Sequence, residues 1–167
     1  MKILLIITAL VFSVSAWSES WKIGKTLEVD PSGIDVTFQV FPDYDPVEKL
    51  VHGWKGEELR YLILVDQQPG GKKSKKYWEG MLKELKKGAD DRKLTVLSEG
   101  VYSGASNNEI SFKVLSWISE GDITTQMYNL VVGKRISYWV IASPFSEDTD
   151  YMVAGAKTLL SSSLLKE

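Results

Sequence analysis

The chain has 167 residues, a formal net charge of −2 and no cysteine. This charge balance argues against a nucleic-acid-binding protein, which would carry a basic surface, and against a strongly acidic partner for the chain as a whole. The lack of cysteine excludes disulfides, thiol catalysis, Cys-ligated zinc and iron–sulfur clusters, so stability must come from packing alone.

Residues 1–16 predict a secretory signal peptide. Lys2 precedes the apolar run ILLIITALVF, and SVSA then forms a small-residue cleavage site that ends at Ala16. An uncleaved membrane anchor is the alternative, but about 12 apolar residues are fewer than the ~20 that span a bilayer. We therefore expect cleavage after Ala16 and a secreted or periplasmic protein. Its mature chain, residues 17–167, should be a single domain and a monomer.

Two short strands are predicted near the mature N-terminus. Lys25–Val29 is the first, and Asp30–Gly33 follows as a turn with proline in its second position. Residues 34–40 alternate apolar and polar side chains, which is typical of a half-buried strand. Phe41 and Pro42 end this strand, because proline cannot donate a ladder hydrogen bond.

Residues 42–57 show no clear period and are expected to be mostly irregular, with room for one helical turn near residues 46–51. Leu59–Gln67 is apolar on both faces and is therefore predicted to be a central strand. A helix is then predicted from about Lys75 to Lys87, with Ser74 as its N-cap. Its apolar stripe consists of Tyr77, Trp78, Met81, Leu82 and Leu85.

The second half of the chain predicts four strands and a closing helix. Leu94–Tyr102 is the first of these strands, and residues 108–142 contain the other three, joined by two tight turns. Gly133 stands at the first central position of one turn, where a type II′ hairpin needs a positive φ. The last helix is expected from about Glu147 to Leu165, with acidic residues in its first turn.

The order of these elements predicts an α+β fold. Sequential hairpins make a largely antiparallel central sheet of about six to seven strands, and strands that are apolar on both faces need helices on each side. Trp117 and Trp139 have the opposite parity to the main apolar set of their strands, so we expect them on the second face. The expected architecture is a single-domain α/β/α sandwich.

Element order and apolar pattern over residues 21–165 resemble the PsbP/Mog-like family. The resemblance covers the strand after Gly33, the segment from Pro42 to Trp54, the amphipathic helix and the hairpin GDITTQMYNLVVGKRISYWVIAS. That family is similar to non-enzymatic assembly and binding proteins, including photosystem II subunits of the thylakoid lumen, Ran-binding nuclear proteins and bacterial envelope proteins of the DcrB type. The resemblance implies a non-catalytic extracytoplasmic binding or assembly module and assigns no cofactor ligand or catalytic residue.

Catalytic and metal chemistry have little support. His52 is the only histidine, and no G-x-S-x-G nucleophile elbow accompanies it. Asp43, Asp45 and Glu48 lack the spacing of an EF-hand loop, and turn formation explains them better than Ca²⁺ binding. We therefore expect no enzymatic activity and no cofactor. The alternative is a small lipid- or ligand-handling protein or hydrolase that uses the loop from Asp43 to Trp54.

Four lysines form a pronounced positive run beside Gly70 and Gly71. They are Lys72, Lys73, Lys75 and Lys76 in the sequence KKSKK. The run is either a solvated loop or a docking surface for an acidic partner, with weaker contact to an anionic membrane surface as a further possibility.

Trp54 is the second candidate for partner binding. It lies near Tyr44 and His52 in the segment predicted to be irregular. It could line a small apolar cleft or a partner surface, or it could be part of the core. We expect a protein partner in the cell envelope and no nucleic acid.

Overall fold

The computed structural model describes residues 21–23, 25–30, 37–40, 48–55, 58–87, 93–119, 121–144 and 149–167. The predicted signal peptide of residues 1–16, its cleavage site, and the carboxylates Asp43 and Asp45 lie outside these ranges. All statements below concern the described residues.

The described part of the chain contains ten strands and two helices. In chain order they are β1 (Trp21–Lys22), β2 (Leu27–Val29), β3 (Thr37–Val40), β4 (Glu48–Lys55), β5 (Glu58–Pro69), α1 (Ser74–Lys87), β6 (Thr95–Ser103), β7 (Glu109–Ser119), β8 (Asp122–Val131), β9 (Ile136–Pro144), α2 (Thr149–Ser161) and β10 (Leu164–Leu165).

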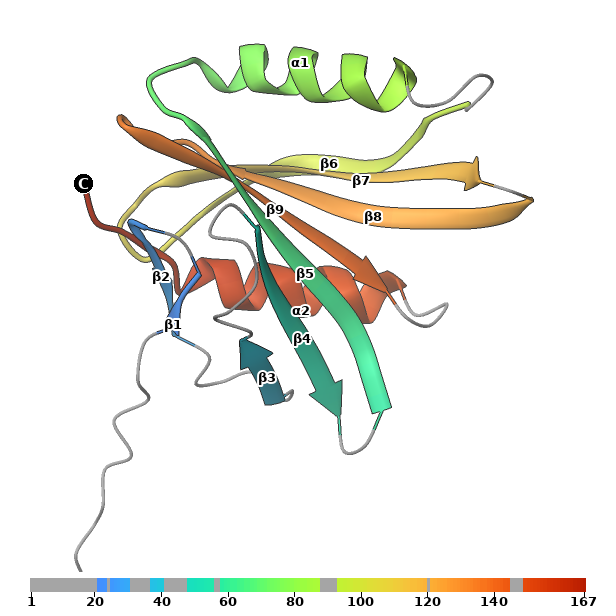
Figure 1. Cartoon of the computed structure of the whole chain (residues 1–167), viewed down its shortest axis with the longest axis horizontal. Helices are drawn as coiled ribbons and strands as arrows, with labels where there is room; N and C mark the ends of the chain where they lie inside the picture. The colour runs from blue at the N-terminus through green and yellow to red at the C-terminus, as the bar shows by residue number, and fades with distance from the viewer. Residues whose placement is uncertain are drawn as a thin grey trace, which may run out of the picture.

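The main sheet has seven strands in the order β3-β4-β5-β9-β8-β7-β6, and every pair in it is antiparallel. A smaller sheet joins β1, β2 and β10. The helices α1 and α2 lie on opposite faces of the main sheet (Figure 1). The predicted α+β fold, with a largely antiparallel sheet and helices on both faces, is therefore confirmed.

Each face of the main sheet has its own core. Beneath α2, the side chains of Met152, Ala156, Leu159 and Leu160 pack against the sheet and against Ile23, Leu27 and Val29. Beneath α1, Tyr77 and Trp78 pack against Leu115, Trp117, Tyr128, Leu130 and Trp139. Trp117 and Trp139 thus belong to the second face, as their parity predicts.

The prediction that residues 42–57 are irregular is wrong for residues 48–55, which form β4. Val51 pairs with Val40 on one side and Ile63 on the other, so the strand lies between β3 and β5. Gly53 and charged residues at both ends weaken the local pattern, and a bulge lies between Gly53 and Trp54. Pairing with two neighbours, which the local sequence does not display, makes this segment a strand.

The closing helix is shorter than predicted. It begins at Thr149 and ends at Ser161, and the chain then turns so that β10 pairs with β2. The Ser162 hydroxyl accepts a hydrogen bond from the Asp30 N–H at 2.8 Å, and its one proton is shared between the Asp30 carbonyl at 2.9 Å and the Leu159 carbonyl at 2.6 Å. These distant contacts divert the chain from a helical path that its composition would allow.

The predicted type II′ turn at Gly133 is also wrong. Four residues separate β8 from β9, and the described glycines with positive φ are Gly71 and Gly121. Gly121, at φ 92°, serves the tight turn in which Ser119 pairs with Asp122. Gly133 is needed for another reason, because a Cβ there would collide with the Ile136 carbonyl oxygen.

Candidate functional site

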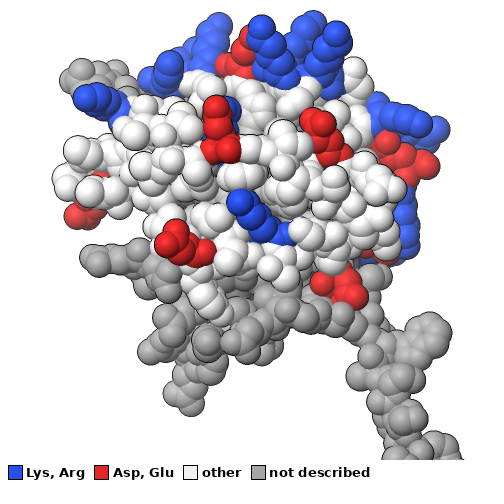
Figure 2. Space-filling model, turned by 180° about the vertical axis from the view of Figure 1, so that it is seen from behind, with Lys and Arg blue, Asp and Glu red and all other residues white. Residues whose placement is uncertain are grey.

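Lysines line the outer side of α1 and the residues just before it. We call this set the α1 lysine surface, and it consists of Lys72, Lys73, Lys75, Lys76, Lys83, Lys86 and Lys87. Lysines appear along the upper margin of the space-filling view (Figure 2), where α1 lies in Figure 1. Residues 72–87 hold seven lysines and two glutamates, a net +5, whereas the whole chain carries −2. The rest of the chain therefore carries −7.

Only part of this charge is compensated nearby. Lys75 Nζ lies 3.8 Å from a Glu79 carboxylate oxygen, and Lys87 Nζ lies 2.8 Å from one of Glu84. The hydrogen bond and charge of Lys87 lower the pKa of Glu84. No other member of the α1 lysine surface forms an ion pair within the described part of the chain. Five of its seven lysines are thus left without a carboxylate partner there.

The positions of the first four lysines oppose the helix dipole. No acidic residue stands in the first turn of α1, and Lys75 and Lys76 occupy it. Positive charge near a helix N-terminus is unfavourable, whereas Lys86 and Lys87 in the last turn are well placed. Helix stability therefore explains the lysines at the C-terminal end but not those at the N-terminal end.

The segment before α1 is held against the connection between β8 and β9. The Gly70 N–H donates to the Arg135 carbonyl at 2.7 Å, and the Gly71 N–H donates to that of Gly133 at 2.9 Å. A Cβ on Gly70 would lie 2.5 Å from the Arg135 carbonyl carbon, so only glycine allows this approach. The lysine run therefore starts from a fixed backbone.

Two aromatic side chains attach α1 to the sheet. The Tyr77 hydroxyl donates to the Pro69 carbonyl and accepts a hydrogen bond from Ser137 Oγ at 2.9 Å. Trp78 Nε1 donates to Ser111 Oγ at 2.9 Å. Because both rings are buried and hydrogen-bonded, the helix cannot easily roll, and its lysines stay on the side that faces away from the sheet.

Ring contacts strengthen the attachment. The Trp78 and Trp139 rings meet edge to face with centroids 4.7 Å apart. Lys113 Nζ lies 5.4 Å from the centre of the Trp78 ring and also pairs with Glu99. Ser74, which the sequence predicts as a cap, is the first helical residue, and its Oγ lies 3.1 Å from Ser111 Oγ.

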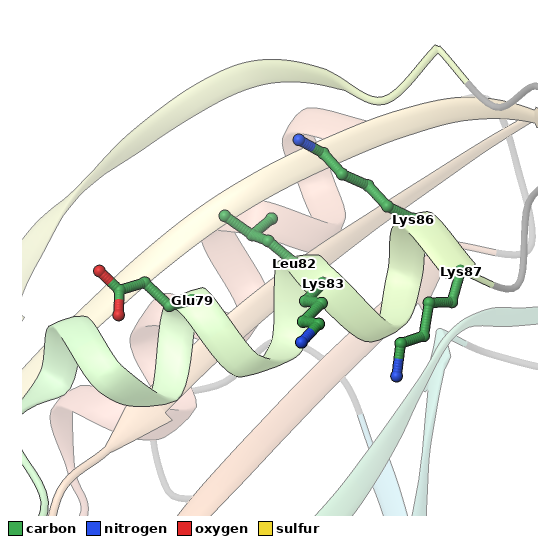
Figure 3. A pocket seen from close by; sticks show the side chains of 5 residues that line it. All are labelled: Glu79, Leu82, Lys83, Lys86 and Lys87. Carbon is green, nitrogen blue, oxygen red and sulfur yellow. The ribbon is translucent and has the colours of Figure 1, made fainter.

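Grooves run along both sides of α1. One, of about 390 Å³, lies on the β5 and β9 side and is lined by Asp66, Gln68, Lys72, Lys76, Tyr77 and Trp139 among others. Another, of about 540 Å³, lies on the β6 and β7 side. A third, of about 410 Å³, is lined by residues near the C-terminal end of α1, where Leu82 and Lys86 extend to one side of the helix and Lys83 and Lys87 to the other (Figure 3).

Trp54 does not join the lysines. It lies in β4 opposite Leu59, at the start of β5, whereas Lys72 follows the end of that strand. Ten residues of strand at ~3.3 Å each separate the two ends by about 33 Å. The lysine run and Trp54 are therefore separate places on the molecule. His52 lies in the same strand as Trp54, opposite Leu62.

Exposed apolar side chains form a feature that sequence analysis missed. They belong to the edge strand β6 and to the tip of the β7–β8 hairpin, and they are Val96, Leu97, Val101, Ile118 and Ile123. Ile118 continues the alternation of Ile110, Phe112 and Val114 in β7, which is the pattern of a core strand. The exposure of the apolar set in β6 and at the hairpin tip depends on the position of the strand in the sheet, and the local sequence does not predict that position.

Within the residues that the structure describes, no group of three or more His, Cys, Asp or Glu side chains could hold a metal ion. The helices among these same residues are too short or too polar to cross a bilayer.

No family model matches this chain, and no curated protein matches it in sequence. The PsbP/Mog-like resemblance accordingly stays a prediction.

Proposed function

We propose that this protein is a non-catalytic, extracytoplasmic binding or assembly module that holds a protein partner in the cell envelope through the α1 lysine surface. The observation that carries the proposal is a net charge of +5 on residues 72–87 of a chain whose total charge is −2. Such a charge separation attracts an acidic surface to one side of the molecule.

The shape of the surface favours a macromolecule over a small anion. The helix has 14 residues, so at ~1.5 Å per residue its lysines extend over about 21 Å. A phosphate or carboxylate ligand would need lysines that converge on one point. Lysines spread along a helix instead match charges spread along a partner.

Its composition favours a protein over a lipid surface. Glu79 and Glu84 interrupt the lysines, and carboxylates would be repelled by anionic headgroups. Exposed apolar residues of β6 lie at the edge of the main sheet that this strand forms. Charge at a rim beside apolar side chains is the usual composition of a protein interface.

The rigid attachment of α1 supports a binding role. Gly70 and Gly71 hold the start of the lysine run by backbone hydrogen bonds, and Tyr77 and Trp78 hold the helix. A surface ordered before binding loses less entropy when it meets its partner. The extracytoplasmic location rests on the signal peptide predicted over residues 1–16.

The alternative, a lipid- or ligand-handling protein or hydrolase, would use a loop from Asp43 to Trp54. Part of that segment is the paired strand β4, which carries His52 and Trp54. The backbone positions of these two residues within the sheet favour a structural role over a catalytic loop.

The test is capture from cross-linked host envelope, followed by binding of the purified partner. The baits are the mature protein, the variant Lys73→Glu/Lys76→Glu, and the control Lys25→Glu/Lys93→Glu, which changes the net charge equally at two exposed lysines outside the α1 lysine surface. We expect one protein to bind the native bait and the control at least tenfold more tightly than the variant, and less tightly as salt rises. Equal binding to all three baits would place the interface elsewhere. A native bait without a partner would contradict the proposal.

A further inference from the structure

The strand β6 forms one edge of the main sheet. It pairs with β7 on one side, and no other described strand pairs with its outer side. An edge strand directs every second backbone N–H and C=O outward, and these groups form a template for a further strand.

This edge lacks the usual protection against strand pairing. Its sequence TVLSEGVYS contains neither lysine nor proline. Glu99 is its one charged residue, and that carboxylate pairs with Lys113 on the neighbouring strand. A register shift between Val96 and Ser98 disturbs one end, but residues 98–103 pair regularly with β7. Six consecutive residues therefore keep a regular register that an added strand can follow.

The side chains of β6 leave apolar surface beside this edge. Val96, Leu97 and Val101 are 46%, 55% and 61% exposed. Val96 stands opposite Leu115 and Val101 opposite Ser111, so both valines project from the face that α1 covers. An added strand would bury them under its own side chains on that face.

The opposite face of the same strand is already ordered. The Tyr102 ring packs on Phe112 with centroids 5.9 Å apart, and its hydroxyl donates to Asn129 Oδ1 at 2.9 Å. At Gly100 a Cβ would lie 2.9 Å from the Phe112 ring, so this ring covers the glycine. The edge is therefore pre-formed rather than induced.

A groove joins this edge to the start of α1. It has a volume of about 540 Å³, and its lining includes Ser74, Lys75 and Trp78 from the helix and Glu99, Val101 and Lys113 from the strands. Lys75 is 86% exposed in its side chain and pairs with Glu79 only at 3.8 Å. A side chain in the groove thus meets both an apolar wall and an ammonium group.

We propose that the outer edge of β6 receives an extended segment of the partner protein as an additional strand. On the face that α1 covers, the segment carries apolar side chains that pack on Val96 and Val101 and an acidic side chain of the same parity that reaches Lys75. The inference rests on the proposed function, because the same partner would span this edge and the α1 lysine surface. Backbone hydrogen bonds provide affinity in this mode of binding, and the alternating side chains provide selectivity.

A second copy of this chain fits less well. Two identical β6 edges that paired antiparallel would form one continuous sheet with a two-fold axis perpendicular to it. Both α1 helices would then lie on the same face, each carrying +5 on residues 72–87. Like charges on one face oppose such a dimer, whereas an acidic segment is attracted to it.

The probe is a pool of synthetic ten-residue peptides in which every second residue, the set that faces α1, is Val, Ile, Asp or Glu in varied order, with Thr at the positions between them. The control pool has the same sequences with N-methyl groups on alternate residues, which removes the backbone donors of one edge. With ¹⁵N-labelled mature protein, we expect the first pool to shift the amide signals of residues 98–103 and to slow their hydrogen exchange at least tenfold. The N-methylated pool should do neither. Equal effects of both pools, or shifts confined to α1, would overturn the inference.

Two variants complete the test. Val101→Lys adds the charge that protects natural edges, and we expect at least a tenfold loss of peptide binding, whereas Val101→Thr should bind nearly as the native protein does. Normal binding by Val101→Lys, or sedimentation that shows β6-dependent dimers in place of peptide binding, would overturn the inference. If the captured partner is lost by Lys73→Glu/Lys76→Glu but kept by Val101→Lys, the proposed function stands and the strand site fails.

Discussion

The two helices cover equivalent faces of one sheet, but they are built differently. α2 presents Met152, Ala156, Leu159 and Leu160, each with no exposed surface, and its small residues allow close packing. α1 rests on the large rings of Tyr77 and Trp78, and its remaining apolar residues are only partly buried. The outer side of α1 carries the lysines.

The surroundings of the helices differ in the same way. The chain after α2 continues into β10, and Lys166 pairs with the nearly buried carboxylate of Glu28 at 2.6 Å. The C-terminal residue Glu167 accepts hydrogen bonds from the N–H groups of Lys134 and Arg135 at 2.7 and 3.0 Å. The α2 layer thus ties both ends of the described chain together, while the α1 layer carries the exposed lysines. One layer is built from fully buried contacts, and the other carries the surface to which we assign partner binding.

The largest expected effect is in the α2 layer. Leu159→Ala should reduce the free energy of unfolding by about 2–5 kcal/mol, because it leaves a cavity at a fully buried site. Leu82→Ala in α1 is the matched control and should cost less than half as much, since Leu82 is only partly buried. Urea unfolding followed by circular dichroism measures both. Equal losses would show that the layers contribute alike.

A smaller effect is expected from Trp78→Phe, which removes the indole donor to Ser111 Oγ and part of the ring. We expect a loss of about 1–3 kcal/mol. Hydrogen exchange should become faster in α1 and stay unchanged in α2, because local opening affects the weaker layer first. Exchange that rises equally in both helices would argue against independent layers.

At the end of the α2 layer, Glu167→Gln should change stability by ~1 kcal/mol and mainly alter its pH dependence. Burial raises the pKa of the Glu167 carboxyl, but backbone hydrogen bonds from Lys134, Arg135 and Ile136 and the charge of Lys134 outweigh it, so the pKa is lowered. A carboxyl with a lowered folded-state pKa contributes stability above its unfolded pKa and loses it as pH falls through the folded pKa.

The native protein should therefore lose this contribution below about pH 4.3, the ordinary value for Glu. The Glu167→Gln substitution removes the titrating group, so the difference between the two proteins should vanish in acid. Thermal unfolding at a series of pH values provides the measurement. A constant difference down to about pH 2, well below that ordinary value, would contradict the assignment of this carboxylate as a charged cap.

The smallest expected effect concerns the α1 lysine surface. Lys76→Glu replaces a positive charge by a negative one in the first turn of α1 and should stabilise the protein by about 0.3–1 kcal/mol. The same change should weaken partner binding. Chemical denaturation beside a binding assay measures the two together, with Lys25→Glu as the control. If Lys76→Glu lowers both stability and binding, the lysine has a structural role instead.

Local patterns account for much of the fold. Alternation of Ile110, Phe112 and Val114 predicts β7, and the stripe through Tyr77 and Trp78 predicts α1 with the correct inner side. The opposite parity of Trp117 and Trp139 correctly predicts a second covered face. These predictions succeed because strand and helix periods are properties of consecutive residues.

Predictions about the candidate site divide along the same line. The lysine run can be read directly from the sequence, and its position on the outer side of a helix follows from the apolar stripe. Its distance from Trp54 does not follow, because Trp54 belongs to a strand, β4, that only its pairing with β3 and β5 reveals. The sequence also does not predict why Gly133 must be glycine. The reason is the close approach of the Ile136 carbonyl oxygen within the same connection, and not a positive φ.

The sequence by itself determined the class of fold, the two faces of the sheet and the charge separation, because each depends on residue type and local spacing. Only the tertiary structure decided that β6 is an edge strand, that Val96 and Val101 stay exposed on it, and that Lys75 shares a groove with Val101. Strand order is set by contacts between residues far apart in the chain, and the pattern of consecutive residues does not predict those contacts.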